Sequence, residues 1–464
     1  MAAVEVIDID AGDVVKLLAQ HEGHFFDFKS KLITPTKLSQ SISALANTDG
    51  GEIIVGVSES NTTFLWDGFD RPEAANPIFQ MLESVCPLGL GITANFLASD
   101  NQSGILLQIE VKKLKDIVNA TDSRAYVRRS AQNLAVTSNE AIQRLRLDKG
   151  LDSFETQTIA ADTDTITNSE AIISFVLEIV PHQEPETWLR KQQLISGTLP
   201  TVAGTILFAD EPQAILPKRC GIKIYRYKTA DDEGTREALT GQPETVEGNA
   251  YSQVYEAVAK TKALIEGIRR MTSEGLAEIN YPEETLHEII TNAVLHRDYS
   301  IADDVHIRVY DNRIEVESPG VLPGHVTPEN ILDTRFARNG NIVRIINKFP
   351  NPPNKDVGEG LNTAFQAMEK LQLKKPIILQ KPESVLVSIR HERLASPEDS
   401  IIEFLGTHES ISNKQARSVC VIREDWRIRS IFSRMVGAGM LEKVPGSTTS
   451  NTAYRKGQNS SGNV

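Results

Sequence analysis

The sequence predicts a multidomain protein of the α+β class. Its 464 residues exceed the usual size of one domain and imply two to four separate hydrophobic cores. Stretches with helical spacing of apolar residues alternate along the chain with short runs that are typical of strands. Hydrophobic residues make up 40% and charged residues 24% of the chain, which is the balance of an ordinary globular protein.

Two changes of pattern divide the chain. A segment rich in Asp and Thr without helical periodicity lies at about 151–167, and a new helical pattern starts after Ser396. We therefore expect these parts in order: a first domain at 1–150, a linker at 151–168, a middle region with a second module at 169–395 whose core covers about 251–395, a third domain at 396–457, and a disordered tail at 458–464.

The first domain is marked by a turn between a helix and a buried strand. An Asn-Thr-Asp-Gly-Gly sequence at 47–51 joins the two, and its glycines permit positive φ angles. Upstream lies the segment 22–29, and downstream the residues 125–130 predict a strand that carries arginines. Together these features resemble the AlbA-like α/β domain shared with Schlafen proteins. The resemblance covers about the first third of the chain and implies nucleic-acid binding.

Positive charge is concentrated in this domain although the whole chain is acidic. The formal net charge of −13 by itself argues against a nucleic-acid partner, but a local basic stripe is the better indicator. The stripe consists of Lys112, Lys113, Lys115, Arg124, Arg128, Arg129, Arg144, Arg146 and Lys149. From this set we expect Lys112, Lys113, Arg128 and Arg129 to contact phosphates. The alternative is a solvated charged face.

Acidic residues in the same domain offer a second hypothesis. In Schlafen nucleases, which this domain resembles, three carboxylates gather a divalent metal for RNA cleavage. The resemblance implies that Glu22, Asp27 and Glu59 form this catalytic set here. Clustered carboxylates suit Mg²⁺ or Mn²⁺ and phosphodiester hydrolysis. The alternative is a set of solvated acidic positions that flank a binding strand.

The middle region mixes helical and strand patterns. Residues 171–177 predict a helix, and the apolar positions of 251–268 recur at helical spacing. The apolar runs at 201–208 and 220–227 both predict strands. These elements lead into the second module.

A carboxylate and an amide lie one helical turn apart in that module. Glu288 and Asn292 share a helix face at the i, i+4 spacing, with apolar residues at the other positions. A carboxylate can orient a water, and an amide oxygen is a hard ligand that Mg²⁺ prefers. The alternative is an ordinary surface pair. The alternating residues of 305–310 and 313–317, joined at Asp311 and Asn312, then predict a β-hairpin.

Two glycine-containing loops follow the hairpin. Gly320 ends a Ser-Pro-Gly loop, and Gly358 and Gly360 open a helix that we expect to extend through Leu371. Glycines at a helix start let backbone N–H groups face a phosphate, and the helix dipole adds attraction.

The order of these elements resembles the divergent GHKL-type ATPase module, an α/β sandwich, of bacterial ATP-binding transcriptional regulators. The His-Arg-Asp-Tyr run at 296–299 is characteristic of that family. By this resemblance Asn292 binds Mg²⁺, Glu288 positions the attacking water, and Gly320, Gly358 and Gly360 belong to the nucleotide site. Where related ATPases carry an Asp for adenine and a Gly-x-Gly, this chain has Glu-Ser-Pro-Gly at 317–320, which favours nucleotide binding without fast hydrolysis.

The C-terminal domain shows three helical segments and a short two-stranded pattern. Ser412 is suited to cap the second helix, and residues 423–437 predict the third. This arrangement resembles a winged helix-turn-helix, whose third helix enters the major groove of DNA. We therefore expect Arg423, Arg427 and Arg429 to contact nucleic acid. The alternative is a protein-docking module of the same shape.

These features predict an ATP-binding and nucleic-acid-binding regulator in which nucleotide controls the domain arrangement. Its cofactors are expected to be ATP and Mg²⁺ or Mn²⁺, its partner DNA or RNA, and a homo-oligomer is left open. The alternative is a metal-dependent ribonuclease in defence or stress. No apolar run approaches a membrane span, the start of the chain is unlike a signal peptide, and the three cysteines are widely separated, so we expect a cytoplasmic protein.

Overall fold

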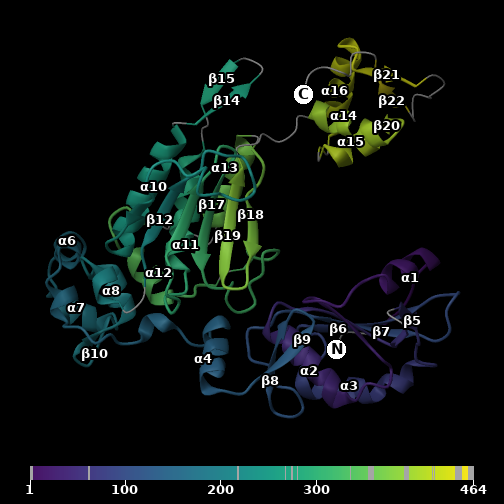
Figure 1. The fold of residues 1–464 in the computed structure, drawn as a ribbon, viewed down its shortest axis with the longest axis horizontal. Helices are drawn as coiled ribbons and strands as arrows, with labels where there is room; N and C mark the ends of the chain where they lie inside the picture. Colours follow the sequence, from purple (N-terminus) through teal and green to yellow (C-terminus); the bar gives the residue numbers. More distant parts are fainter. Residues whose placement is uncertain are drawn as a thin grey trace. The chain divides into compact units, whose positions relative to one another are not determined.

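The computed structural model describes residues 4–60, 63–216, 219–266, 268–272, 275–278, 281–334, 336–353, 360–371, 373–390, 397–420, 422, 424–444 and 452–457. The chain forms two compact units: one comprises Met1–Ala367 and Pro376–Ile389, and the other comprises Met368–Lys375 and Arg390–Val464. The expected multidomain α+β class is confirmed (Figure 1). Among the described residues, no helix combines the length and apolar character needed to cross a membrane.

The N-terminal domain is built on a five-stranded sheet. The strands lie in the order β1 (Val6–Asp8), β6 (Ile92–Ala98), β7 (Leu106–Val111), β3 (Gly51–Val55) and β2 (Phe26–Lys29). The two outer pairs are parallel and the two inner pairs are antiparallel. Its helical elements are α1 (Ala11–Leu18), α2 (Pro35–Asn47), the 3-10 turn η1 (Pro72–Ala75) and α3 (Asn76–Val85).

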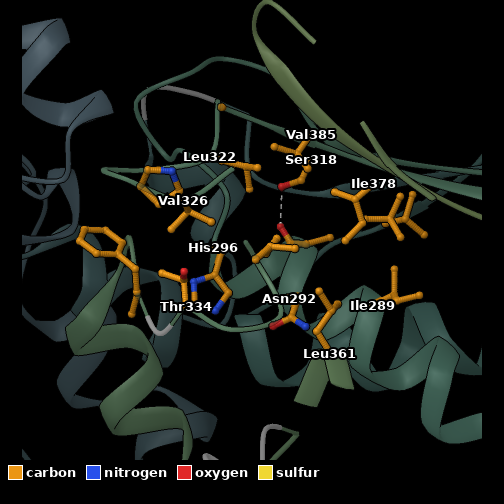
Figure 2. A pocket seen from close by; sticks show the side chains of 18 of the residues that line it. Ile289, Asn292, His296, Ser318, Leu322, Val326, Thr334, Leu361, Ile378 and Val385 are labelled. Carbon is orange, nitrogen blue, oxygen red and sulfur yellow. Dashed lines mark hydrogen bonds between the residues drawn. The ribbon is translucent and has the colours of Figure 1, made fainter. Parts of the chain in front are cut away.

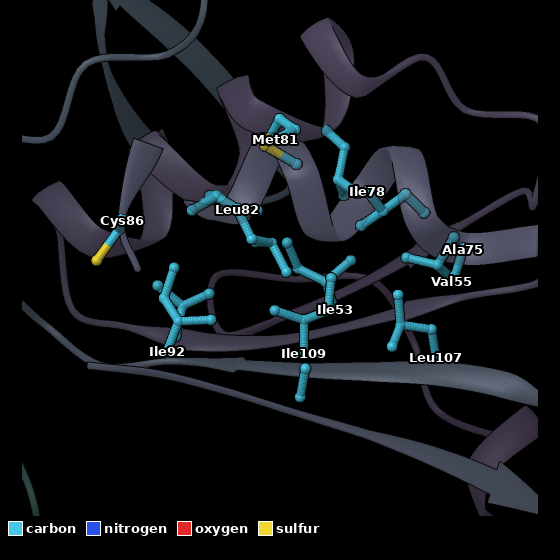
Figure 3. Packing of buried hydrophobic residues seen from close by; sticks show 14 of the residues in the cluster. Ile53, Val55, Ala75, Ile78, Met81, Leu82, Cys86, Ile92, Leu107 and Ile109 are labelled. Atoms are coloured by element: carbon cyan, nitrogen blue, oxygen red, sulfur yellow. The ribbon is translucent and has the colours of Figure 1, made fainter. Parts of the chain in front are cut away.

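Both faces of this sheet are covered by apolar side chains. Ile53 and Ile109 pack with Leu82 of α3 on one face, where all three are fully buried (Figure 3). Ile54 points to the opposite face and packs with Phe28, as the alternation of a strand requires. The sheet therefore holds the 47–51 turn, at the start of β3, on a rigid support.

Two hairpins and one helix complete the N-terminal domain. They are β4 (Val57–Ser60) with β5 (Thr63–Trp66), β8 (Ala125–Arg129) with β9 (Gln132–Val136), and α4 (Asn139–Asp148). The expected arginine-bearing strand is β8.

The middle region is mostly helical. Its elements are the 3-10 turn η2 (Phe154–Thr156), α5 (Asp164–Thr167), α6 (Glu170–Ile179), α7 (Pro185–Lys191), β10 (Ile195–Ser196), β11 (Leu199–Pro200), α8 (Val202–Phe208) and α9 (Pro212–Ile215). The segment expected to be a linker, 151–168, thus carries η2 and α5. It also buries Ile166 and Glu155, and the Glu155 carboxylate accepts the backbone N–H groups of Asn341 and Ile342 at 2.7 and 2.8 Å.

The strand predicted at 201–208 is wrong, because these residues form α8. The Thr201 side chain accepts a hydrogen bond from the N–H of Gly204 and caps the helix. All residues from Val202 to Phe208 are buried, so the run has no polar face. A short and uniformly apolar run does not distinguish a buried helix from a buried strand.

The second module contains a six-stranded sheet. The strand order is β13 (Glu244–Val246), β12 (Ile222–Arg226), β16 (Val305–Val309), β17 (Arg313–Pro319), β19 (Ser384–Arg390) and β18 (Ile377–Gln380). Two long helices, α10 (Ala250–Glu266) and α11 (Glu283–Leu295), lie against the sheet (Figure 1). The module also contains β14 (Arg269–Thr272), β15 (Gly275–Glu278), α12 (Gly340–Ile346) and α13 (Gly360–Lys370). The structure confirms the predicted hairpin as β16 and β17, with His306 opposite Glu317.

The second unit is a small helical domain with a three-stranded sheet. Its elements are α14 (Pro397–Thr407), β20 (Ile411–Ser412), α15 (Asn413–Val419), α16 (Asp425–Gly437), β21 (Leu441–Lys443) and β22 (Ala453–Lys456). The sheet is antiparallel with the order β20-β22-β21. Ser412 caps α15 as expected, in a capping box with Gln415. Ile401, Ile428 and Phe432 form the centre of the core.

Candidate functional site

A cavity of about 420 Å³ lies between α11 and the adjoining sheet (Figure 2). Its apolar lining consists of Ile289, Ala293, Val316, Pro319, Val321, Leu322, Pro323, Val326, Ile331, Leu332, Phe336, Ala337, Val343, Leu361, Ile378, Val385 and Val387. A few polar groups, among them Glu288, Asn292, His296 and Asn362, share the lining. An apolar cavity with a few convergent polar groups is the usual form of a small-molecule site.

The predicted pair Glu288 and Asn292 lies in the wall of this cavity. The Asn292 amide nitrogen donates a 2.7 Å hydrogen bond to Glu288 Oε1, so the amide oxygen points away from that carboxylate. Burial raises the pKa of Glu288, and the hydrogen bond from Asn292 only partly offsets the shift. The amide oxygen is the atom that could bind a hard cation, and the carboxylate is the group that could take or orient a proton.

Gly320 also lines the cavity, and its backbone conformation requires glycine. Its φ angle is +105°, and a Cβ atom there would lie 2.6 Å from the Cβ of Asp298. The preceding Ser318 hydroxyl donates to the backbone oxygen of Ala293 in α11 at 2.8 Å (Figure 2). The Ser-Pro-Gly segment, expected to be a loop, thus forms the end of β17 and the first residue after it, and the Ser318 hydrogen bond ties that strand end to the helix that carries Asn292.

Glu317 takes no part in the cavity wall. Its carboxylate accepts bonds from Arg308 at 2.6 Å, Ser384 at 2.6 Å and Lys381 at 3.0 Å. Burial alone would raise the pKa of Glu317, but these three partners hold it at about 2. The carboxylate is therefore committed to the sheet, while its neighbours Val316 and Ser318 reach the cavity.

The helix that begins at the predicted phosphate-binding glycines reaches the cavity with its first turn. Gly360 is the first residue of α13, and the next residues, Leu361 and Asn362, line the cavity. Figure 2 shows Leu361 beside Asn292. Gly358 lies outside the described residues.

The His-Arg-Asp-Tyr run at 296–299 contributes one lining residue to the cavity and buried residues next to it. His296 is in the lining, and burial, with a contribution from the positive charge of Arg338, lowers its pKa to about 4, so the ring is neutral at pH 7. Arg297 is buried and donates to the backbone oxygens of Arg219 and Asp303. In the sequence this run is only a motif characteristic of the family. In the structure it has a role in packing.

Asp298 in the same run is the centre of a buried ion cluster. Its Oδ2 atom lies 2.8 Å from Arg144 and 3.1 Å from Arg338. Burial alone would raise the pKa of Asp298, but Arg338, Ser300 and Arg144 hold it below its usual value. The cluster ties α4 of the N-terminal domain to the cavity wall.

The structure places Arg128, which was expected to contact a phosphate, in the interior of the domain. Its side chain is buried, and the guanidinium donates to the backbone oxygen of Gly23 at 2.8 Å, to Asn133 at 2.7 Å and to Asp27 at 3.2 Å. Two consecutive arginines in a strand point to opposite faces, and the sequence does not reveal which of the two points inward. Only the neighbouring Arg129 is exposed.

Lys113 is likewise an internal residue. It was expected to contact a phosphate, but the structure buries it and pairs it with Asp49 at 3.3 Å. Burial lowers the pKa of Lys113 although Asp49 opposes the shift. Lys112 is exposed, so Lys112 and Arg129 are the members of the predicted set that a phosphate can reach.

The three predicted carboxylates do not form a common metal site. Asp27 is buried between Lys29 at 2.6 Å and Arg128, and Glu22 accepts the backbone N–H of Phe28 at 3.1 Å. Burial raises the pKa of Glu22, whereas Lys29 lowers it. Glu59 is exposed on the β4–β5 hairpin. Among the described residues, no three His, Cys, Asp or Glu side chains are gathered in a way that could hold a metal ion.

Two of the three arginines predicted in the C-terminal unit, Arg427 and Arg429, lie on α16. Arg427 and Arg429 are exposed and lie 3.9 and 2.5 Å from Glu424 and Asp425. Surface ion pairs of this kind are weak, so a phosphate could compete for either arginine. Arg423 lies outside the described residues.

Sequence reasoning missed most of the cavity lining. The irregular stretch after Gly320 supplies residues from Val321 to Ala337, and β18 and β19 supply Ile378 and Val385. The signal was the frequent large apolar side chains in a stretch with neither helical nor strand periodicity. Such side chains in a long loop are expected to cover a core or a ligand.

Comparison with known proteins identifies two segments. Residues 22–137 match the family model described as "Schlafen, AlbA_2", and residues 302–389 match the HATPase_c_4 model, described as "Putative ATP-dependent DNA helicase recG C-terminal". The chain contains both domains. The AlbA_2 domain includes the 47–51 turn and β8, and the HATPase_c_4 domain includes Gly320 and most of the cavity lining but begins after Asn292. The recognition of an AlbA-like domain and an ATPase-like domain is thereby confirmed.

Two further comparisons complete the picture. The crystal structure of the DIP2311 protein from Corynebacterium diphtheriae is similar at 17% sequence identity, with 96% of each chain covered and a TM-score of 0.39. At this TM-score the likeness carries no structural argument. A search of curated proteins found no match.

Proposed function

We propose that this protein is a cytoplasmic, ATP-binding regulator that binds nucleic acid. The observation that carries the proposal is the apolar cavity with Glu288 and Asn292 in its wall, in a module that includes a HATPase_c_4 domain. The AlbA_2 domain supports a nucleic-acid partner. A regulatory role is the interpretation that uses both domains.

The residues around the cavity fit a magnesium nucleotide. The apolar lining suits a base, and Asn292, whose amide oxygen is not the atom bound to Glu288, suits Mg²⁺ between phosphate oxygens. The start of α13 reaches the cavity, where backbone N–H groups favour phosphate. Because Glu317 is held by three partners, base recognition is assigned to the apolar lining.

Nucleic acid is proposed to bind at exposed basic residues of both units. On the AlbA_2 domain these are Lys112 and Arg129, the exposed members of the predicted contact set. In the C-terminal unit the order of helices and strands supports a winged helix-turn-helix, with α16 as the helix that contacts DNA through Arg427 and Arg429. The ribonuclease alternative has no comparable observation in its favour, because Asp27 is neutralised by Lys29 and Arg128.

Calorimetry with Mg·ATP tests the nucleotide site. The parent is expected to bind, and Asn292→Ala is expected to stay folded but to bind at least about tenfold more weakly, because the change removes a metal ligand at a cavity edge. Asn101→Ala, at an exposed asparagine between β6 and β7, is the matched control. Equal affinity in the parent and Asn292→Ala, or no binding by the parent, would end the proposal.

A further inference from the structure

A closed ring of hydrogen bonds joins the wall of the cavity to the 47–51 turn of the AlbA_2 domain. Its four members are Asp49, Lys113, Leu322 and Gln380. We propose that this ring couples nucleotide in the cavity to nucleic acid on the AlbA_2 domain. The inference rests on the proposed function and assigns the regulation of that site.

The backbone of Leu322 is held on both sides by the ring. Its carbonyl oxygen accepts a bond from Lys113 Nζ at 2.9 Å, and its N–H donates to Gln380 Oε1 at 2.9 Å. The other ends of these two side chains meet on Asp49, where Gln380 Nε2 donates to Oδ1 at 2.7 Å and Lys113 Nζ lies 3.3 Å from the same atom. A shift of Leu322 therefore strains its bond to Lys113 of the AlbA_2 domain and its bond to Gln380, the side chain that donates to Asp49 of that domain.

The side chain of Leu322 lines the cavity (Figure 2), while its backbone N–H and carbonyl groups bond to the ring. A ligand that fills the cavity thus contacts the residue that Lys113 and Gln380 hold. The surrounding loop has a further tie to the N-terminal domain, because the N–H of Gly324 donates to the backbone oxygen of Asp148 at 3.0 Å. The wall loop is therefore an element with one face on the cavity and the other on the N-terminal domain.

On the other side of the ring, Asp49 belongs to a turn that is tightly held. Its Oδ2 atom lies 2.9 Å from His24 Nε2. The preceding Thr48 hydroxyl accepts the backbone N–H of Arg128 at 2.8 Å, at the strand that leads to the exposed Arg129. A displacement of Asp49 is therefore transmitted to β8, which is the proposed nucleic-acid strand.

Burial makes the ring respond as a unit. Lys113 is buried, and the side chain of Asp49 is only 18% exposed. Because these groups are largely shielded from water, breaking one bond costs more than it would at the surface, and the arrangement is expected to switch between discrete states. Coupling between two sites requires such an element in contact with both.

Anisotropy of labelled oligonucleotides with the full chain tests the coupling. The affinity for one RNA and one DNA is measured with and without saturating Mg·AMPPNP, and in parallel the affinity for Mg·AMPPNP is measured alone. The parent should show a change of about fivefold or more in oligonucleotide affinity on adding the nucleotide. Gln380→Met keeps the volume of the side chain but removes both hydrogen bonds. In this variant the ratio of oligonucleotide affinities with and without nucleotide should fall close to one, while each ligand alone should bind within about twofold of the parent.

The matched control is Gln242→Met, at an exposed glutamine before β13. This variant should show the same ratio of oligonucleotide affinities, with and without nucleotide, as the parent. If the parent binds both ligands without coupling, or if Gln380→Met couples them as the parent does, the ring is not the link and only this inference fails. If Mg·AMPPNP does not bind the parent, the proposed function fails and the coupling with it. Melting curves of both variants establish that each is folded.

Discussion

At the scale of single residues, polar side chains here owe their chemistry to the groups around them. Glu288 and Glu317 lie on neighbouring elements, yet burial raises the pKa of Glu288 while three partners lower that of Glu317 to about 2. Two carboxylates in different surroundings thus take different roles. Glu288 is the one suited to proton transfer, and Glu317 is the one suited to holding strands together.

The first prediction concerns Glu288. Glu288→Gln should retain Mg·ATP binding but lose any slow hydrolysis, because the amide cannot take a proton from water. Since the pKa of Glu288 is raised, the rate in the parent should begin to fall with decreasing pH at a value above that of an ordinary glutamate. Single-turnover assays measure both effects. Glu283→Gln, at an exposed residue on the same helix, is the control, and hydrolysis by Glu288→Gln at the parent's rate would exclude the role.

The second prediction concerns the pH dependence of stability at Asp49. Burial would raise the pKa of Asp49, but His24, Lys113 and Gln380 hold it at about 2, below the ordinary value of 3.8. A lowered folded-state pKa stabilises the native state above the unfolded value by about 2 kcal/mol, and this contribution is lost as the pH falls from about 4 to 2. Asp49→Asn should therefore melt below the parent at pH 6, with a clearly smaller gap at pH 3. A gap independent of pH would contradict the ion pairing.

At the scale of elements, loops rather than regular elements complete the site. Gly320, which directly follows strand β17, approaches Asp298 so closely that only glycine fits there. The stretch that follows supplies much of the apolar lining. Helix α11 and strands β17 to β19 are the support on which these loops are held.

The third prediction tests that close approach. Gly320→Ala should lower the free energy of unfolding by about 1–3 kcal/mol, because its φ of +105° is strained for alanine and its Cβ would meet Asp298. The displaced loop should also weaken Mg·ATP binding. Denaturant unfolding and calorimetry measure the two effects. Gly340→Ala, where a Cβ would have no neighbour within 4 Å, should change neither quantity, and equal behaviour of the two variants would refute the steric argument.

The sequence predicts those elements whose residues follow a local periodicity, and it does not predict features that depend on residues distant in sequence. The hairpin of β16 and β17 was predictable because its residues alternate around an Asp-Asn turn, and Glu288 and Asn292 share a face by helical spacing alone. Helix α8 was not predictable because it is buried on all sides. The inward orientation of Arg128 and Lys113 was hidden as well, since it depends on Asp27 and Asp49, which are distant in sequence.

At the scale of the whole molecule, the chain is acidic, but exposed basic residues occur at particular places on it. The net charge is −13, so nucleic acid is expected only where basic side chains are exposed and acidic ones are few. With Lys113 and Arg128 internal, the exposed basic set is smaller than the sequence predicts. Lys112 and Arg129 remain on the AlbA_2 domain, and Arg427 and Arg429 remain on α16.

The fourth prediction measures those contacts. Lys112→Ala and Arg129→Ala should each weaken RNA or DNA binding across sequences and reduce the slope of log affinity against log salt by about one, because each removes one phosphate contact. Lys16→Ala, at a 79% exposed lysine on α1, is the control and should leave the slope unchanged. If neither AlbA_2 variant changes the slope, the binding face lies elsewhere, and Arg427→Ala with Arg429→Ala tests α16 next.

The most direct test of the central claim is a crystal structure of the full chain grown with Mg·AMPPNP. We predict nucleotide density in the cavity between α11 and the sheet, with Mg²⁺ bound to Asn292 Oδ1 and the phosphates at the start of α13. Nucleotide bound at another place, or an empty cavity at a nucleotide concentration that saturates the protein in calorimetry, would contradict the account.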